Sequence, residues 1–215
     1  MLDVVIATRN PRKVIELRRV LAVPGIRWHS LLDFPDARSP REDGRTFDAN
    51  AVKKAVVAAR ATGLLALADD SGIEVNGLGG GPGVQSARFS GRHGDDRSNN
   101  EKLLKLLKGR PAEARRARYR CSLALADGTR ALAVTRGTWA GRIAESPKGA
   151  GGFGYDPLFL VGGYGKTAGQ LPAAVKRRLS HRTIAARRMR LVLRRLIAGS
   201  RRGNSRAGRS PARSA

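Results

Sequence analysis

Short apolar runs alternate with helical segments along the chain, and this alternation restricts the fold more than any other feature of the sequence. Residues 2–7 and 64–68 are brief apolar runs that fit buried strands. Asn10-Pro11 begins a helical segment, because asparagine is a favoured N-cap and proline is favoured at the first helical position. Residues 47–60 repeat the helical spacing with alanines on one side. Strands interleaved with helices predict the α/β class.

One hairpin signal indicates that the sheet is not purely parallel. Residues 118–126 and 130–137 flank Asp127-Gly128, a dipeptide that favours a tight turn between antiparallel strands. Three more elements are expected, namely a helix over 99–107, a short strand over 157–161 and a final helix from Ser180 to about Ile197. We therefore predict an α/β fold with a mixed sheet.

The charge of the chain is strongly basic and uneven. The 215 residues include 42 Lys and Arg against 17 Asp and Glu, which gives a net charge of +25, and no acidic residue follows Asp156. Residues 199–215 contain no large apolar side chain and cannot offset the entropy lost on ordering. We predict one domain over 1–198 and a basic disordered tail over 199–215. The tail is either an arm for anionic surfaces or a product of an arginine-rich composition, and nucleic-acid contact is expected only there and without specificity.

Cysteine content and hydropathy exclude several classes of protein. Cys121 is the single cysteine, so an internal disulfide is impossible. The longest apolar runs are too short to span a bilayer, and the first residues lack the pattern of a secretory signal. We expect a soluble cytoplasmic protein that has an anionic partner and does not contact the membrane.

The first segment with chemical potential joins the first strand to the first helix. A helix N-terminus carries unpaired backbone N–H groups and a favourable dipole for an anion. Thr8 and Asn10 add neutral donors beside Pro11, while Arg9, Arg12 and Lys13 add positive charge. The segment fits a phosphate cradle without the glycines of a Walker loop, and it equally fits a capped helix with solvated basic side chains.

The second segment is Asp69-Asp70-Ser71-Gly72, which follows the apolar run 64–68. Ligands of α/β sheets gather at the carboxyl ends of strands. Adjacent carboxylates beside apolar surface need a compensating cation, and Mg²⁺ binds one or two carboxylates together with phosphate oxygens. The alternative is a turn in which Asp69 caps the backbone and Asp70 is solvated.

The third segment is the glycine-rich stretch 149–157. One of its aromatic residues, Phe153 or Tyr155, could stack on a base, and Asp156 could accept a hydrogen bond from a ring N–H. The alternative is a turn whose aromatic rings fill the core. Further on, Lys176 and Ser180-His181-Arg182 bring donors to the start of the final helix, although a lone histidine is more often structural than catalytic.

These segments together resemble the inosine/xanthosine triphosphate pyrophosphatase family. The matches occur in family order at residues 7–13 with Glu16, Thr46-Phe47 with Asn50-Ala51 and Lys54, 69–72 with 78–80, Pro82-Gly83 with 86–88, 151–157, 166–168, and Lys176 with 180–182. The resemblance implies Mg²⁺-dependent hydrolysis of deaminated purine nucleoside triphosphates (ITP, dITP, XTP) to the monophosphate and pyrophosphate. It also implies a homodimer and an elongated, curved mixed sheet with flanking helices, in two lobes with the active-site cleft between them.

The resemblance also implies roles for individual residues. Asp70 is the expected catalytic residue and, with Glu42, a metal ligand. Lys54 is expected to neutralise the triphosphate, and Ser71 to contact the substrate. The phosphate-binding loop would consist of Thr8, Arg9, Asn10, Pro11, Arg12 and Lys13. The base and sugar pocket would consist of Phe153, Gly154, Tyr155, Asp156, Lys176, His181 and Arg182.

Three positions depart from the family pattern, in which bacterial members often have Glu at position 49, Tyr at 85 and Glu at 170. Here these positions are Ala49, Gln85 and Gln170. Two other functions remain open from the residues alone. One is a basic nucleic-acid-binding protein without enzymatic activity, although no known binding motif supports it. The other is a pyrophosphatase for other modified nucleotides.

Overall fold

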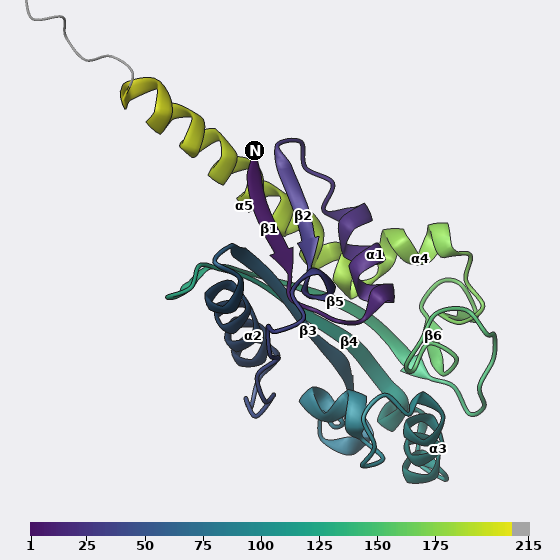
Figure 1. Ribbon diagram of the computed structural model, residues 1–215. Helices are drawn as coiled ribbons and strands as arrows, with labels where there is room; N and C mark the ends of the chain where they lie inside the picture. Colours follow the sequence, from purple (N-terminus) through teal and green to yellow (C-terminus); the bar gives the residue numbers. More distant parts are fainter. Residues whose placement is uncertain (208–215) are drawn as a thin grey trace, which may run out of the picture.

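The computed structural model describes residues 1–207, with side chains through Gly199, and contains one mixed sheet within that range (Figure 1). The strands lie in the order β2-β1-β3-β4-β5-β6-β7. Their bounds are β1 Leu2–Ile6, β2 Ile26–Ser30, β3 Leu65–Val75, β4 Arg116–Ala126, β5 Ala131–Ile143, β6 Phe159–Val161 and β7 Lys166–Thr167. The helices are α1 Pro11–Val20, α2 Phe47–Thr62, α3 Asp96–Leu107, α4 Ala173–Leu179 and α5 His181–Ala207. Short 3-10 turns cover Leu31–Asp33, Asn76–Leu78, Gly83–Arg88 and Ala112–Arg115.

The pairing of neighbouring strands changes once across the sheet, from parallel to antiparallel. β1 pairs in parallel with β2 and β3, whereas each later pair, from β3–β4 to β6–β7, is antiparallel. The β4–β5 hairpin turns at Asp127, whose carboxylate accepts hydrogen bonds from the backbone N–H groups of Thr129 and Arg130, both at 2.8 Å. The predicted α/β class, mixed sheet and hairpin are therefore confirmed.

The first lobe is built on both faces of the sheet, because successive strand residues point to opposite sides. On one face, Leu67 and Leu123 pack with α1 and α5. On the other face, Ala66 and Ala124 pack against the alanines of α2. Small side chains on this second face let α2 lie close to the sheet, and α2 is the helix that carries Asn50 and Lys54.

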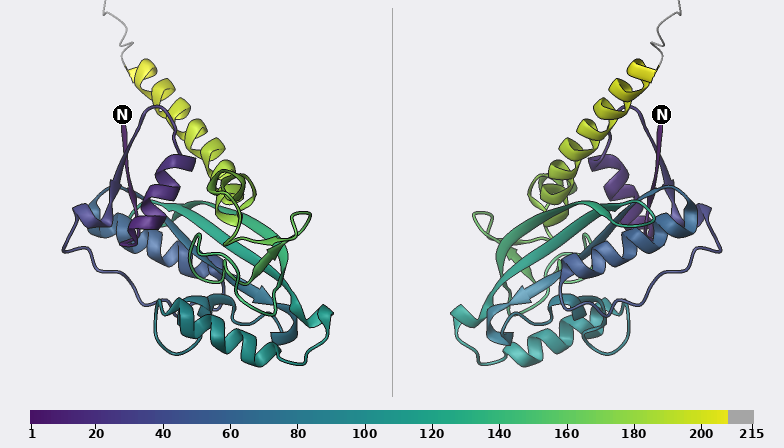
Figure 2. Two further views of the ribbon diagram at one scale, coloured as in Figure 1. Left: turned by 90° about the vertical axis from the view of Figure 1, so that its right-hand side faces the viewer. Right: turned by 90° about the vertical axis from the view of Figure 1, so that its left-hand side faces the viewer.

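The second lobe covers the other half of the same sheet. Its core joins Ile73 and Tyr119 on the strands to Leu103 on α3 and to Leu158 and Phe159 near β6. Figure 2 shows α3 at the end of the molecule opposite the projecting α5. β3, β4 and β5 contribute residues to the cores of both lobes, so the lobes share one continuous set of strands.

The strand that contains the paired acids is longer than predicted. The sequence suggested that the strand ends at Ala68, yet β3 continues to Val75 and pairs with β4 from Ala66 to Val75. Asp69 and Asp70 therefore lie in mid-strand, where basic side chains compensate their charge. β1 ends at Ile6 and pairs with β3 only as far as Leu67, so the two acids follow the carboxyl end of the parallel pair.

Other boundaries also differ from the sequence analysis. β2 and α4 were not expected, and α3 begins at Asp96 rather than near residue 99. α5 continues to Ala207, beyond the end expected near Ile197, so residues 199–207 of the predicted tail are helical. Residues 208–215 lie outside the described residues, and the separate, disordered tail stays a prediction. Within residues 1–207, no helix combines the length and hydropathy that a bilayer crossing requires.

Candidate active site

The loop before α1 presents few free backbone donors. Asn10 Oδ1 accepts hydrogen bonds from the N–H groups of Arg12 (3.0 Å) and Lys13 (3.3 Å), and Thr8 Oγ1 accepts from the N–H of Asn10 (3.2 Å). Pro11, at the first helical position, has no N–H to offer. Asn10 is thus the helix cap, as predicted. An anion at this loop would meet chiefly the side chains of Arg12 and Lys13.

Arg9 binds a neighbouring loop through its guanidinium. Its guanidinium donates to the backbone carbonyls of Phe34 (3.3 Å), Pro35 (3.0 Å) and Ala37 (2.8 Å). Three carbonyls converging on one guanidinium indicate a structural tether between the β1–α1 loop and residues 34–37.

This tether predicts a stability effect. Arg9→Ala should lower the free energy of unfolding by about 1–2 kcal/mol, because three charged hydrogen bonds to backbone carbonyls are lost. Arg12→Ala is the matched control, since Arg12 is exposed and its side chain has no recorded partner in the described part of the chain; it should change stability by less than about 0.5 kcal/mol. Urea denaturation measures both, and equal effects would contradict the tether.

Asp69 is the centre of a buried ion-pair cluster that joins α1, β3 and α5. Lys13 Nζ lies 3.0 Å from one of its oxygens and 3.1 Å from the other, and Arg182 Nε lies 3.4 Å away. Arg182 also donates to Glu16 (2.8 Å) and to Ser71 Oγ (2.9 Å). Burial alone would raise the pKa of Asp69, but the charges of Lys13 and Arg182 hold it well below its usual value. Asp69 therefore stays ionised at neutral pH.

Asp70 and Glu42 form a second centre, on the face of the sheet that α2 covers. Lys54 Nζ on α2 lies 2.8 Å from Asp70 Oδ1 and 3.0 Å from Glu42 Oε1. Asn50 Nδ2 donates to the other Asp70 oxygen (3.2 Å), and Arg88 donates to the backbone carbonyl of Glu42 (2.8 Å). The family resemblance implied that Glu42 lies near Asp70. The structure brings these two carboxylates together although they are 28 positions apart in the sequence.

Burial shifts the ionisation of this second centre. Burial raises the pKa of Asp70 above its usual value, although Lys54 opposes the shift. Burial would lower the pKa of Lys54, but the charges of Asp70, Asp69 and Glu42 outweigh burial and raise it. Lys54 is therefore positively charged at neutral pH, and Asp70 is a stronger base than an exposed aspartate.

The Asp70–Glu42 pair fits a hard divalent cation. The described residues contain no group of three or more His, Cys, Asp or Glu side chains arranged to hold a metal alone. Two carboxylates suit Mg²⁺, which takes its remaining ligands from water and substrate phosphates. One cation, the Lys54 ammonium, already contacts both carboxylates, which shows that they converge on a common point.

The glycine-rich segment and the start of α5 form a third group. Asp156 is 4% exposed; it accepts hydrogen bonds from Lys176 and from the N–H of Phe153 (2.9 Å). The Phe153 ring centroid lies 5.6 Å from Lys176 Nζ and 5.6 Å from Arg182 Cζ. The ring of His181 stacks on Tyr119 at 4.6 Å. The predicted base-pocket residues are therefore close together, except that Arg182 is largely engaged by the Asp69 cluster.

His181 is the least satisfied polar group of this set. Its Nδ1 is buried and has no hydrogen-bond partner among the residues that the structure describes. Burial, together with the charges of Arg182 and Lys176, holds the pKa of His181 well below its usual value. A neutral imidazole with one unpaired nitrogen can donate to or accept from a ligand.

The sequence analysis did not identify the residues of α3 that bind the Phe153 loop. Asp96 and Asn100, one turn apart on α3, bind the two sides of Gly154: Asp96 accepts from its N–H (2.7 Å) and Asn100 donates to its carbonyl (2.9 Å). Tyr155 donates to the carbonyl of Ser86 (2.9 Å), so it is a core residue rather than a stacking platform. No motif in the sequence links α3 to this loop.

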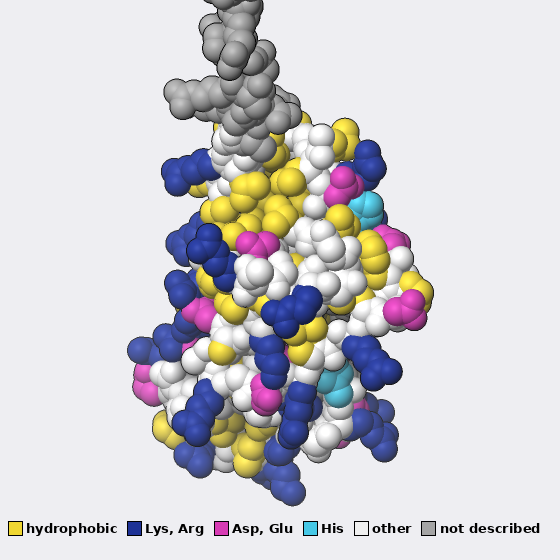
Figure 3. Space-filling view, turned by 60° about the vertical axis from the view of Figure 1, so that its left-hand side comes forward, with side chains coloured by type: hydrophobic (Ala, Val, Ile, Leu, Met, Phe, Trp, Pro, Cys, Tyr) yellow, Lys and Arg dark blue, Asp and Glu magenta, His cyan; other side chains and the backbone are white. Residues whose placement is uncertain are grey.

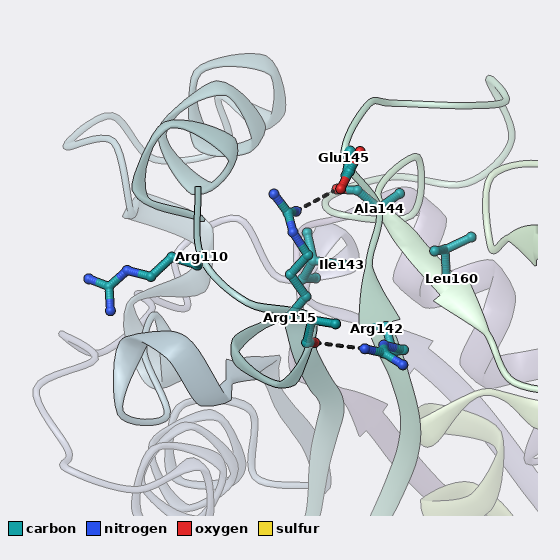
Figure 4. Close-up of a pocket in the computed structure, with 8 residues that line it drawn as sticks. Arg110, Arg115, Arg142, Ile143, Ala144, Glu145 and Leu160 are labelled. Carbon is teal, nitrogen blue, oxygen red and sulfur yellow. Dashed lines mark hydrogen bonds between the residues drawn. The ribbon is translucent and has the colours of Figure 1, made fainter. Parts of the chain in front are cut away.

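A surface hollow of about 320 Å³ lies elsewhere, near β6 (Figure 4). Two of its arginines are bound to backbone: Arg115 donates to the carbonyl of Ala144 and Arg142 to that of Ala112. Arg110 points away from the others in Figure 4. The hollow does not bring convergent donors together and includes no residue of the centres described above.

Comparison with known proteins shows the family of this chain. The model of the Ham1 family matches residues 4–192, a range that includes all three centres described above. The chain belongs to the Ham1 family. A dITP/XTP pyrophosphatase of Desulforamulus reducens is 47% identical over 195 residues, which cover 91% of this chain and 97% of the relative. The dITP/XTP pyrophosphatase of Bacillus subtilis is 41% identical over 193 residues, covering 90% and 98% respectively.

Solved structures of the family have the same fold. A HAM1 protein from Coxiella burnetii superposes with a TM-score of 0.83 at 36% identity, covering 91% of this chain and 100% of that one. A nucleoside-triphosphatase (dITP/XTP pyrophosphatase) from Mycobacterium abscessus gives a TM-score of 0.74 at 42% identity, covering 87% and 98%. The resemblance and the curved mixed sheet in two lobes that it implied are confirmed.

The departures from the family pattern are accommodated locally. Gln170 Oε1 accepts from the N–H of Thr167 (3.1 Å), and Gln85 Oε1 accepts from Arg88 (2.6 Å). Ala49 lies in the first turn of α2, where its N–H donates to the cap residue Thr46 (3.1 Å). Each of these contacts is compatible with an uncharged side chain in this Ham1-family chain.

Proposed function

We propose that this protein hydrolyses deaminated purine nucleoside triphosphates (ITP, dITP and XTP) to the monophosphate and pyrophosphate. The observation that carries the proposal is the presence of two adjacent acid–base centres on β3 in a Ham1-family fold: Lys13 pairs with Asp69, and Lys54 bridges Asp70 and Glu42. The biological role is to remove these nucleotides from the pool before they are incorporated into nucleic acid. In this proposal the protein acts in the cytoplasm as a homodimer.

The phosphates are bound by charge. A triphosphate carries about four negative charges near neutral pH, and an NTP pyrophosphatase must neutralise them as pyrophosphate leaves. Lys13 and Lys54 supply positive charge, with Arg12 at the rim. Lysine and arginine side chains are numerous over the lower part of the face in Figure 3, and a basic surface raises the local concentration of an anionic substrate.

Asp70 and Glu42 are the residues that would hold Mg²⁺. When bound, Mg²⁺ supplies charge stabilisation to the phosphoryl oxygens and orients the substrate. Asp70, with a pKa raised by burial, is also suited to accept a proton from the water that attacks the α-phosphorus. Asn50 fixes the orientation of this carboxylate through its second oxygen.

The base is read by the Phe153 segment, by Lys176 on α4 and by the start of α5. Phe153 offers a ring face for stacking, and Lys176 and His181 offer donors. Hypoxanthine and xanthine present an acceptor oxygen at C6, where adenine presents an amino donor. A donor-lined pocket therefore accepts the first two bases and leaves adenine facing unpaired donors.

Pyrophosphate release tests the proposal directly. We expect ITP, dITP and XTP to be hydrolysed far faster than ATP, by up to about 10⁴-fold in kcat/KM, with GTP intermediate or poor. Chelation of Mg²⁺ with EDTA should abolish turnover, and added Mg²⁺ should restore it. Comparable rates on ATP, CTP and UTP would contradict the assignment, and faster hydrolysis of another modified nucleotide would redirect it.

A further inference from the structure

The contacts of Lys54 do not match those of a lysine that is free to bind phosphate. Its ammonium bridges the two carboxylates expected to hold Mg²⁺, at 2.8 Å from Asp70 and 3.0 Å from Glu42. The Lys54 side chain is only 11% exposed and that of Asp70 only 9% exposed. A lysine bound in this way is not free to meet a triphosphate.

The carboxylates are oriented by contacts that do not involve Lys54. Asp70 retains the hydrogen bond from Asn50, whose own Oδ1 accepts from the N–H of Gly44 at 2.8 Å. Arg88 holds the backbone of Glu42, and its second guanidinium nitrogen lies 3.9 Å from the Glu42 carboxylate. The pair would therefore keep its arrangement if the ammonium moved away.

Charge favours an exchange of cations at this point. The Asp70 side chain is 9% exposed and that of Glu42 is 30% exposed, and two carboxylates this close destabilise each other unless a cation compensates them. One ammonium supplies a single positive charge for two negative ones, whereas a divalent cation supplies both. Each of these cations needs the same carboxylate oxygens, so they compete.

We propose that Lys54 is the resident counter-ion of the Asp70–Glu42 pair and moves to the substrate phosphates when nucleotide and metal bind. The inference rests on the proposed function, because the triphosphate is what gives Lys54 its second partner. Its consequence is that the protein without nucleotide binds divalent metal weakly. Metal binding and nucleotide binding are thereby coupled through one side chain.

Lys13 provides a matched control. It is also a partly buried lysine, 21% exposed, and it pairs with the neighbouring acid Asp69. Its recorded partner is Asp69 alone, and neither Asp70 nor Glu42 is among its contacts in the described residues. Removal of Lys13 therefore takes the same charge from the site without vacating the carboxylate pair.

The test is Mn²⁺ binding to the full chain in the absence of nucleotide, followed by electron paramagnetic resonance or calorimetry. Lys54→Met should bind Mn²⁺ at least about tenfold more tightly than the unaltered protein, because the competing cation is gone. Lys13→Met should stay within about threefold of it. Lys54→Arg restores a bridging cation and should return affinity toward the unaltered value.

Thermal unfolding supplies a second measurement that does not depend on activity. Without metal, Lys54→Met should unfold at a lower temperature than the unaltered protein, and saturating Mn²⁺ should stabilise the variant more than the unaltered chain. Unchanged or weaker Mn²⁺ binding by folded Lys54→Met would overturn the inference. Failure of the unaltered protein to hydrolyse ITP would instead overturn the proposed function, so the two failures are distinguishable.

Discussion

Asp70→Asn is expected to lower ITP turnover by about a thousandfold or more. The substitution removes one charge from the carboxylate pair and the base best placed to accept a proton from water, and such losses amount to several kcal/mol of transition-state stabilisation. It also replaces an oxygen by an NH₂ group. Since Lys54 and Asn50 donate to the two Asp70 oxygens, one donor would face another donor. Steady-state kinetics with saturating Mg²⁺ measure the effect.

The control for Asp70→Asn is Asp43→Asn. Asp43 lies next to Glu42 in sequence, but its side chain is 54% exposed and pairs with the surface residue Lys53. An exposed pair of this kind contributes little to stability, and we expect turnover within about twofold of the unaltered protein. Near-normal turnover by folded Asp70→Asn would remove Asp70 from its catalytic role.

Gly137→Ala is expected to disturb the site on the face of the sheet that α5 covers, opposite the face covered by α2. A Cβ atom at Gly137 would lie 2.0 Å from the carbonyl oxygen of His181 and 2.7 Å from the N–H nitrogen of Ala185. Both atoms belong to the backbone of α5, so no side-chain rotation relieves the clash. The first turn of α5 must move away from β5, and with it His181 and Arg182.

Two quantities should change in Gly137→Ala. The free energy of unfolding should fall by about 3 kcal/mol, the upper part of the range for overpacking. Turnover of ITP should fall by about a hundredfold, since a misplacement of about 1 Å is enough for such a loss. Gly128→Ala, in the turn of the same hairpin, is the control, because its Cβ would meet only Arg60 at 3.5 Å. Equal behaviour of the two variants would show that α5 tolerates the added methyl group.

Local signals in the sequence predicted local structure well. Asn10 is the cap of α1, and Asp127 closes the β4–β5 turn, because each side chain satisfies backbone N–H groups within three residues. Such contacts depend on sequence spacing alone. The proximity of Lys176 to Asp156 was also indicated, but only through the family resemblance.

Features that depend on distant partners were not predictable from the residues. The pair Asp69-Asp70 suggested the end of a strand, because two adjacent charges rarely continue into a core. β3 continues through them since Lys13, Lys54 and Arg182 arrive from three different helices to compensate the charge. Neither their convergence nor the role of Arg9 as a loop tether can be inferred from local spacing.

The continuity of β3, β4 and β5 through both lobes limits how the enzyme can move. Hinge motion requires a few loop or terminal residues that absorb large backbone rotations. β3 pairs with β4 without interruption from Ala66 to Val75, so the connection between the lobes is stiff, and Asp69 and Asp70 lie near its middle. Enclosure of the substrate must therefore come from the irregular segments around Glu42 and Phe153. We expect the catalytic cycle to involve fast, local loop movements and little rotation of one lobe against the other.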